Sequence, residues 1–220
     1  MNKLSFRLEF ISSLVDERII ADVGCDHGKL VRKLFDENKI DFAYVSDISR
    51  GSLQKAIDLL KDKKDKIKAI CCDGLSGYDE SKIDECIIAG MGGYEILNII
   101  KNSKVDIQKY ILAPQHDNLV LKEYLINNQY KITFDIIIKD KNKFYNIIKC
   151  EKCNNPDKLS EFELWFGKDN FENSYSAIKD YVENNLIKLY LIKQNQKTID
   201  AKVEKSIMLF EKAKKELNYE

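Results

Sequence analysis

The 220-residue sequence predicts an α/β fold in which a mostly parallel sheet is closed by an antiparallel hairpin and followed by an antiparallel helical hairpin. Three observations support this. Short apolar runs alternate with amphipathic stretches from residue 19 to about 152, which is typical of βα units. Two long β-like runs then follow each other with only a turn between them. After residue 156 the composition changes to long polar helices, so we predict two parts, residues 1–155 and 156–220.

The predicted strands are short and rich in branched or aromatic residues, as buried parallel strands are. They are IIADV (19–23), FAYVSDI (42–48), IKAICCD (67–73), ECIIAG (85–90) and YILAP (110–114). Between them, apolar residues recur at three- and four-residue spacing, which predicts helices over 29–38, 52–62, 93–102 and 118–128. The predicted hairpin pairs 130–140 with 144–152 around KNK.

Composition restricts the class of protein. The chain has 36 Lys and Arg, 36 Asp and Glu and 44% hydrophobic residues, which indicates a soluble globular protein whose affinity for nucleic acid must be local. Arg7 and Glu9 interrupt the first apolar run, so we expect no signal peptide, no membrane span and a cytoplasmic location. Cys150 and Cys153 have C-x-x-C spacing, but no second ligand pair lies near them in sequence, and we predict no metal.

The C-terminal helices carry excess positive charge. Residues 186–215 contain eight lysines against Asp200, Glu204 and Glu211. Such a charge run is commonly a solvated helix face, and it can also follow the phosphates of a nucleic acid. Both interpretations remain open at this point.

The stretch ADVGCDHGKL (21–30) places a glycine turn after the first predicted strand, at the sheet edge where ligands bind in open α/β folds. A pyrophosphate would need a glycine where Asp26 stands, and Asp22 adds a second negative charge. S-adenosylmethionine carries an ammonium and a sulfonium and has no phosphate, so flanking carboxylates attract it. The turn therefore favours S-adenosylmethionine as the ligand.

Further candidate ligand residues follow the other strands. Asp47 ends the second strand, where a carboxylate can accept hydrogen bonds from ribose hydroxyls, and Asp73 follows the third, where it could accept from an adenine amino group. Either acid alone could instead be a cap or turn residue. AGMGG (89–93) allows close approach of the backbone to a ligand, or simply makes a turn that needs positive φ.

The motifs ADVGCDHG, SDIS, CDG, AGMGG and ILAPQ together resemble the class I, Rossmann-like methyltransferases. More narrowly, the chain resembles the bacterial tRNA adenine-N1 methyltransferases that modify adenine 22 in the D-arm region. The likeness covers nearly the whole chain, including LSFRLEFISSLV (4–15) and the helical hairpin. It implies S-adenosylmethionine-dependent methyl transfer to N1 of an adenine in tRNA, by a protein that we expect to be monomeric. AGMGG stands where methyltransferases of exocyclic amino groups carry a Pro-Pro loop, which also favours a ring nitrogen as acceptor.

The resemblance and the strand ends together give the expected site residues. For the catalytic role we expect Asp26 and His27, although His27 could equally be a hydrogen-bonded turn residue. The expected cofactor-binding residues are Asp22, Gly24, Cys25, Asp26, His27, Gly28, Asp47, Ile48, Cys72, Asp73, Gly74, Ala89, Gly90, Met91 and Gly92. The expected tRNA contacts are Arg7, Lys29, Gln115, His116, Lys188, Lys193, Lys197, Lys202 and Lys205.

Two other functions are compatible with the same residues. The chain could be a methyltransferase of a small molecule or protein, with the helical hairpin used for dimerisation. It could also be a non-catalytic module that binds the cofactor or a nucleotide.

Overall fold

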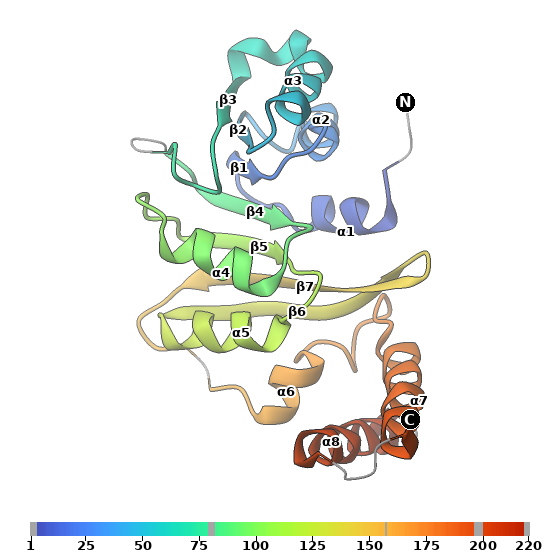
Figure 1. The fold of residues 1–220 in the computed structure, drawn as a ribbon. Coiled ribbons are helices and arrows are strands. Elements are labelled where there is room, and N and C mark those ends of the chain that lie inside the picture. The colour runs from blue at the N-terminus through green and yellow to red at the C-terminus, as the bar shows by residue number, and fades with distance from the viewer. Residues whose placement is uncertain (1–3, 79–81, 157, 196–199, 218–220) are drawn as a thin grey trace.

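The computed structural model describes residues 4–78, 82–156, 158–195 and 200–217, and it contains one seven-stranded sheet (Figure 1). The strands are β1 (Ile19–Val23), β2 (Phe42–Asp47), β3 (Ile67–Cys71), β4 (Glu85–Ala89), β5 (Lys109–Ala113), β6 (Tyr130–Asp140) and β7 (Lys143–Lys152). Their order is β3-β2-β1-β4-β5-β7-β6. Neighbours among β1 to β5 are parallel, and β7 is antiparallel to both β5 and β6. The predicted sheet and hairpin are confirmed, with β7 as the one reversed strand.

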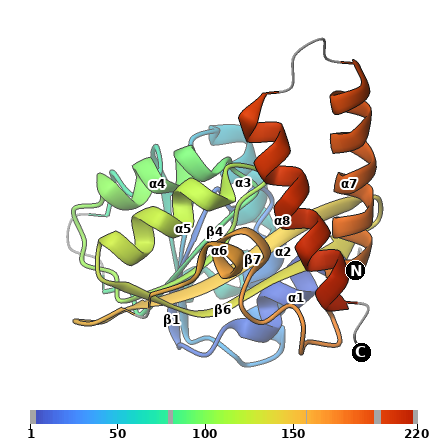
Figure 2. The same ribbon diagram turned by 90° about the horizontal axis from the view of Figure 1, so that it is seen from below.

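Helices cover both faces of the sheet (Figure 2). On one face lie α1 (Phe6–Leu14), α2 (Lys29–Asp36) and α3 (Arg50–Leu59), and on the other lie α4 (Gly93–Lys101) and α5 (Asn118–Asn127). Local chemistry starts these helices: the Ser5 and Ser49 hydroxyls accept from the amides of Leu8 and Ser52, which caps α1 and α3. The predicted helices are confirmed, whereas the 3-10 segment η1 (Lys61–Lys66) and the short α6 (Glu161–Phe166) were not predicted.

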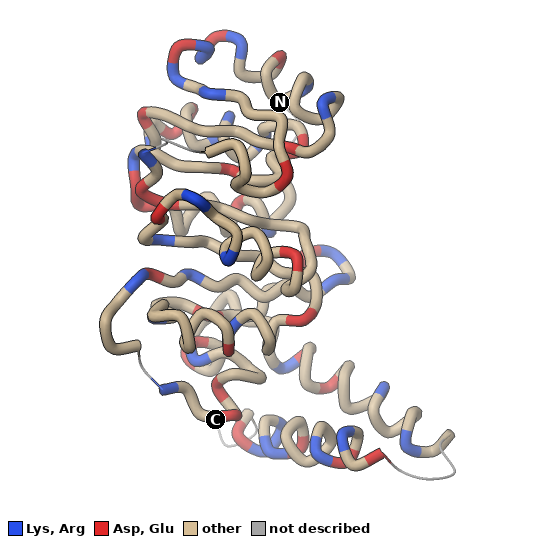
Figure 3. Tube along the Cα trace, turned by 60° about the vertical axis from the view of Figure 1, so that its left-hand side comes forward, with Lys and Arg blue, Asp and Glu red and all other residues tan. Residues whose placement is uncertain are grey.

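The C-terminal hairpin consists of α7 (Ile178–Asn195) and α8 (Ala201–Leu217), which pack antiparallel beside the β6 edge of the sheet (Figure 2). Ile178 and Val182 of α7 and Phe210 of α8 are buried together with Ile137 of β6. The far end of α7 is not part of this packing, because Ile192 is 43% exposed. Figure 3 shows Lys and Arg along both helices, with Asp and Glu among them.

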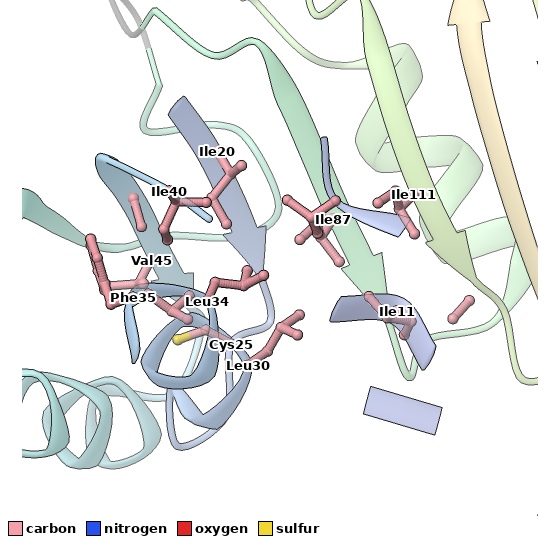
Figure 4. Packing of buried hydrophobic residues seen from close by; sticks show 14 of the residues in the cluster. Ile11, Ile20, Cys25, Leu30, Leu34, Phe35, Ile40, Val45, Ile87 and Ile111 are labelled. Carbon is pink, nitrogen blue, oxygen red and sulfur yellow. The ribbon is translucent and has the colours of Figure 1, made fainter. Parts of the chain in front are cut away.

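Two apolar clusters hold the helices to the sheet. The cluster under α1, α2 and α3 is drawn in Figure 4, where Ile11, Leu34 and Ile87 converge from a helix, a second helix and a strand. The opposite cluster joins Ile96 and Leu121 of α4 and α5 to the other face. Because both faces of the central strands β1, β4 and β5 are buried, these strands carry nearly continuous apolar runs instead of alternating ones.

The outer edge of β6 is hydrogen-bonded to the segment that leads into α7. The amides of Asp135 and Ile137 donate to the side chains of Asp169 and Asn170, both at 2.7 Å. In return, the amide of Ala177 donates to the carbonyl of Ile137 at 2.7 Å. These contacts satisfy an edge strand that would otherwise present free amides and carbonyls. They also fix where α7 begins relative to the sheet.

A buried ion pair connects this region internally. The Nζ of Lys122 on α5 lies 2.5 Å from Oδ2 of Asp135, and both side chains are 0% exposed. The same Nζ donates to the carbonyl of Leu164 on α6 at 3.1 Å. Burial raises the pKa of Asp135, and the neighbouring Lys122 charge opposes that rise. Each buried charge is therefore stabilised by the other.

We predict that Lys122→Met lowers the free energy of unfolding by about 3–5 kcal/mol, because it leaves the Asp135 carboxyl buried without its partner. Urea unfolding followed by circular dichroism measures the change. Lys122→Met/Asp135→Leu should recover most of the loss, and Lys101→Met, at an exposed position of α4, is the matched control. A Lys122→Met protein as stable as the control would contradict the prediction.

Candidate active site

The first glycine turn is fastened to β2. The amides of Gly24 and Cys25 both donate to the carbonyl of Ser46 at 2.9 Å, and the amide of Asp26 donates to Oδ2 of Asp47 at 3.2 Å. Gly24 (φ +73°), Asp26 (φ +49°) and Gly28 (φ +67°) have left-handed backbone conformations. Glycine adopts these freely, and aspartate is among the residues that tolerate them best. The turn is thus a defined loop between β1 and α2.

A cleft of about 630 Å³, which we call the donor cleft, opens at the carboxyl ends of β1, β2, β3 and β4. Of the predicted residues it brings together Gly24, Asp47, Ile48, Cys72, Asp73, Gly74, Ala89, Gly90 and Met91. Its acidic side chains are Asp47, Asp73 and Glu95, and the residues found to line it include no Lys, Arg or His. This charge pattern fits a cation and opposes a pyrophosphate.

Asp47 has a second role besides lining the cleft. Its Oδ1 accepts from the amide of Ser49 at 2.8 Å, while its Oδ2 accepts from Asp26. Both carboxylate oxygens are thereby oriented by backbone amides. A carboxylate held in this way is a preorganised acceptor for two neighbouring hydroxyls.

A smaller cavity of about 270 Å³, the reaction pocket, adjoins the donor cleft. Gly24, Ala89 and Gly90 line both spaces. The other predicted residues along the reaction pocket are Asp22, Cys25, Asp26, His27, Arg7, Lys29 and Gln115. Predicted cofactor and substrate residues therefore meet at one place.

The acids of the reaction pocket differ strongly in environment. Asp22 is 5% exposed, and burial, followed by the negative charge of Asp47, raises its pKa to about 7. The side chain of Asp26 is 73% exposed and lies 3.4 Å from the Nε2 of His27. That same His27 nitrogen is 3.3 Å from the Nζ of Lys55. Asp26 is thus the accessible carboxylate, and the His27 ring lies between the carboxylate of Asp26 and the amino group of Lys55.

The AGMGG loop is joined to the loop that follows β5. The amide of Gln115 donates to the carbonyl of Met91, and the amide of Gly93 donates to that of His116, both at 2.9 Å. A Cβ at Gly92 would lie 2.5 Å from the His116 ring. A Cβ at Gly24 would lie 2.4 Å from the Met91 methyl group, so Met91 packs directly over the first turn.

Some predicted residues lie outside both spaces. Gly28 packs against Ala56 of α3, and Gly92 packs against His116, so we find both at packing positions away from the lining. His116 and Lys188 line a third cavity beside α7. Lys193 and Lys202 are exposed on the helical hairpin, Lys205 forms an ion pair with Glu161 at 2.5 Å, and Lys197 lies outside the described residues.

The sequence reasoning missed one side of the donor cleft. Glu95, Asn98 and Asn102 of α4 and the loop after it line the cleft, together with Leu75, Ser76 and Ile99. The three polar residues recur at helical spacing directly after AGMGG, and this signal could have identified them. Ser46 was also missed, and its buried hydroxyl has no hydrogen-bond partner among the described residues.

Neither a metal site nor a membrane span is found in the part of the chain that the structure describes. No group of three or more His, Cys, Asp or Glu side chains there could hold a metal ion. No helix among the described residues is long and apolar enough to cross a membrane.

Comparisons with known proteins show the family to which the chain belongs. The model of the TrmK family, described as tRNA (adenine(22)-N(1))-methyltransferase, matches residues 20–216. The tRNA (adenine(22)-N(1))-methyltransferase of Bacillus subtilis is 26% identical over 155 residues, which are 68% of this chain and 65% of that protein. M. capricolum TrmK in complex with S-adenosyl-homocysteine has a TM-score of 0.88 at 28% identity, covering 97% of this chain and 99% of that one.

A Streptococcus pneumoniae protein in complex with S-adenosyl-L-methionine has a TM-score of 0.85 at 24% identity, covering 96% of this chain and 100% of that one, and this similarity shows the fold. The family model spans most of the chain, and the acidic cleft lies where a methyl donor is expected. The chain therefore belongs to the tRNA (adenine(22)-N(1))-methyltransferase family and is an S-adenosylmethionine-dependent enzyme that methylates N1 of an adenine in tRNA.

Proposed function

We propose that the chain methylates adenine 22 in the D-arm region of tRNA, with the donor held in the donor cleft and the adenine in the reaction pocket. One observation carries the proposal. An acidic cleft whose described lining residues include no basic side chain shares Gly24, Ala89 and Gly90 with a pocket that contains Asp26 and His27. Donor and acceptor can therefore meet across the ends of β1 and β4.

The residues of the donor cleft fit the chemistry of S-adenosylmethionine. When bound, this donor supplies an electrophilic methyl group on a positively charged sulfur. We assign Asp47 to the ribose hydroxyls and Asp73 to the adenine amino group. Leu75, Met91 and Ile99 supply apolar surface for the adenine ring. Asp22 and Asp26 favour the positive end of the donor through their charge.

The reaction itself requires mainly alignment and exclusion of water. Adenine N1 has an in-plane lone pair that would take the methyl group directly while the methyl–sulfur bond breaks and S-adenosylhomocysteine leaves, so no general base is required. The methylated base is a cation, and a nearby carboxylate stabilises charge that develops in the transition state. Asp26 takes this role because it is the exposed carboxylate in the reaction pocket, and His27 positions it through their 3.4 Å contact.

The target base must leave its base pair or stack before N1 becomes accessible. Arg7, Lys29 and Gln115 line the pocket that we propose to receive the base. Lys193 and Lys202 are exposed on the helical hairpin and can hold the RNA backbone without reading its sequence. Lys205 is less available because Glu161 already neutralises it.

We also propose that the enzyme acts as a monomer in the cytoplasm. The buried apolar stripes of α7 and α8 face each other and β6 within one chain, so the hairpin does not need a second copy to cover them. A tRNA substrate supports the cytoplasmic location.

We predict that Asp47→Asn weakens S-adenosylmethionine binding by about tenfold to 100-fold, because hydrogen bonds to a charged acceptor contribute about 1.5–3 kcal/mol. Isothermal titration calorimetry measures the dissociation constant. Asp58→Asn is the matched control, since this acid lies exposed on α3, is absent from the donor-cleft lining and accepts a hydrogen bond from Gln54. An unchanged affinity in Asp47→Asn would remove Asp47 from the donor site.

We predict that Asp26→Asn lowers kcat by about tenfold or more at saturating donor, because the transition state loses a stabilising charge. The assay follows labelled methyl groups from S-adenosylmethionine into N1-methyladenosine of unmodified tRNA. Asp65→Asn, an exposed substitution in η1, should keep the wild-type rate. Label in a different nucleoside would contradict the proposed reaction, and a wild-type kcat in Asp26→Asn would contradict the role of Asp26.

We predict that Lys193→Gln/Lys202→Gln reduces the salt dependence of tRNA binding. Two lost phosphate contacts should lower the slope of log K against log salt by about 1.5. Filter binding at several salt concentrations measures the slope. Lys64→Gln/Lys101→Gln removes the same charge from exposed positions away from the hairpin. Equal slopes for the two double variants would exclude these hairpin lysines as contacts.

A further inference from the structure

A third cavity of about 430 Å³ lies where the β6–β7 turn meets α7. Its lining combines cationic, aromatic and amide side chains, and none of the residues found to line it is acidic. The lining includes Arg7, Asn142, Lys143, Tyr145, Asn185 and Lys188. Aromatic faces, amides and free cations together are the chemistry that recognises unpaired nucleotides.

This cavity adjoins the reaction pocket. Arg7 and Gln115 line both spaces, so the two share a wall. An RNA strand whose adenine enters the reaction pocket would bring a neighbouring nucleotide to this wall.

Arg7 is held in a position that suits contact with a base. Its guanidinium carbon lies 4.8 Å from the ring centroid of Tyr145, which is a cation–π arrangement. Its main-chain amide donates to Oδ2 of Asp140 at 3.2 Å, which anchors the start of α1 to the hairpin turn. The Nη1 atom is buried and has no hydrogen-bond partner among the described residues. Guanidinium planes stack on unpaired bases, so the guanidinium of Arg7 is a candidate stacking partner.

The nearby acids are largely engaged elsewhere. Asp180 pairs with Lys139 at 2.5 Å, and Asp117 pairs with His116 at 2.6 Å. Lys143 and Lys188 are exposed, and within the described ranges no ion pair is found for either. Both lysines therefore keep their charge available for a phosphate.

A larger cavity of about 590 Å³ beside α1 and α2 provides a contrast. Its Arg32 pairs with Asp36 at 2.6 Å, and its Lys33 pairs with Glu9 at 2.8 Å and Glu37 at 2.7 Å. Acidic side chains neutralise much of its positive charge, so less of that charge is available to bind a polyanion.

We propose that the cavity between the β6–β7 turn and α7 binds an unpaired nucleotide that directly adjoins the target adenine in the RNA chain. The proposal rests on the proposed function, because it assumes an RNA whose adenine occupies the reaction pocket. Lys143 and Lys188 hold the phosphate, and the Arg7–Tyr145 stack supports the base. Asn142 and Asn185 can donate to or accept from the base edge, so this site contributes to sequence preference at the neighbouring position.

The phosphate contact is tested with two charge-matched double variants. Lys143→Gln/Lys188→Gln removes the two cavity lysines, and Lys141→Gln/Lys179→Gln removes two exposed lysines from the same turn and the same helix. We expect the first pair to raise the KM for unmodified tRNA about tenfold, the size expected for lost phosphate contacts, with an unchanged donor affinity. The second pair should stay within about twofold of wild type. Equal KM values for the two pairs would overturn the proposal.

The base contact is tested with tRNAs that carry an abasic site on either side of the target adenine. We expect one of the two positions to lower kcat/KM of the wild type about tenfold, as loss of base stacking does. Asn142→Ala/Asn185→Ala should lower kcat/KM on intact tRNA and respond less to the same abasic site. An abasic effect of equal size in wild type and variant would overturn the nucleotide site while leaving the methyl transfer intact. Absence of label from the wild type would overturn the proposed function and this site with it.

Discussion

The active site depends on the reversal of strand order at β1, where the chain completes β2 and β3 on one side of this strand and then returns to form β4 on its other side. β1 pairs in parallel with β2 on one side and β4 on the other, and Val23 is level with both Ser46 and Ile88. The loops that follow these strands leave toward opposite faces, since α2 and α4 cover different sides. A crevice must therefore open at their carboxyl ends. Gly24, Ala89 and Gly90 border both the donor cleft and the reaction pocket because they end β1 and β4.

Charge then selects the ligand that this crevice can accept. Asp47, Asp73 and Glu95 face a cleft whose described lining has no basic side chain. Asp22 lies deeper, and its pKa of about 7 means that its carboxyl is partly protonated near neutral pH. A cation nearby favours the ionised carboxylate. Binding of a positively charged donor therefore lowers the pKa of Asp22 and increases the negative charge on its carboxyl group. The same acids would repel a dinucleotide, whose phosphates need amides and cations.

The sequence predicted the strands, the β-hairpin, the helical hairpin and most of the crevice lining, because these features follow local periodicity and the residues that end each strand. It did not separate a lining role from a packing role: Gly28 and Gly92 belong to the same motifs as Gly24 and Gly90 but pack against Ala56 and His116. It also missed the Lys122–Asp135 pair, whose partners are separated by the turn between α5 and β6. A lysine on an amphipathic helix gives no local sign that a short later helix will bury it.

The β6 edge of the sheet fixes the position of the helical hairpin relative to the reaction pocket. Asp169 and Asn170 fill the hydrogen bonds of β6, and Ala177 continues this pairing directly into α7. Helix α7 therefore starts at a fixed point relative to β6. The last residue of this strand, Asp140, accepts a hydrogen bond from the main-chain amide of Arg7. Because Arg7 borders the reaction pocket, backbone pairing, and not a flexible linker, connects the helical hairpin to that pocket. An RNA bound along the hairpin would consequently meet the reaction pocket at a defined register, which is the condition that selecting one adenine among many requires.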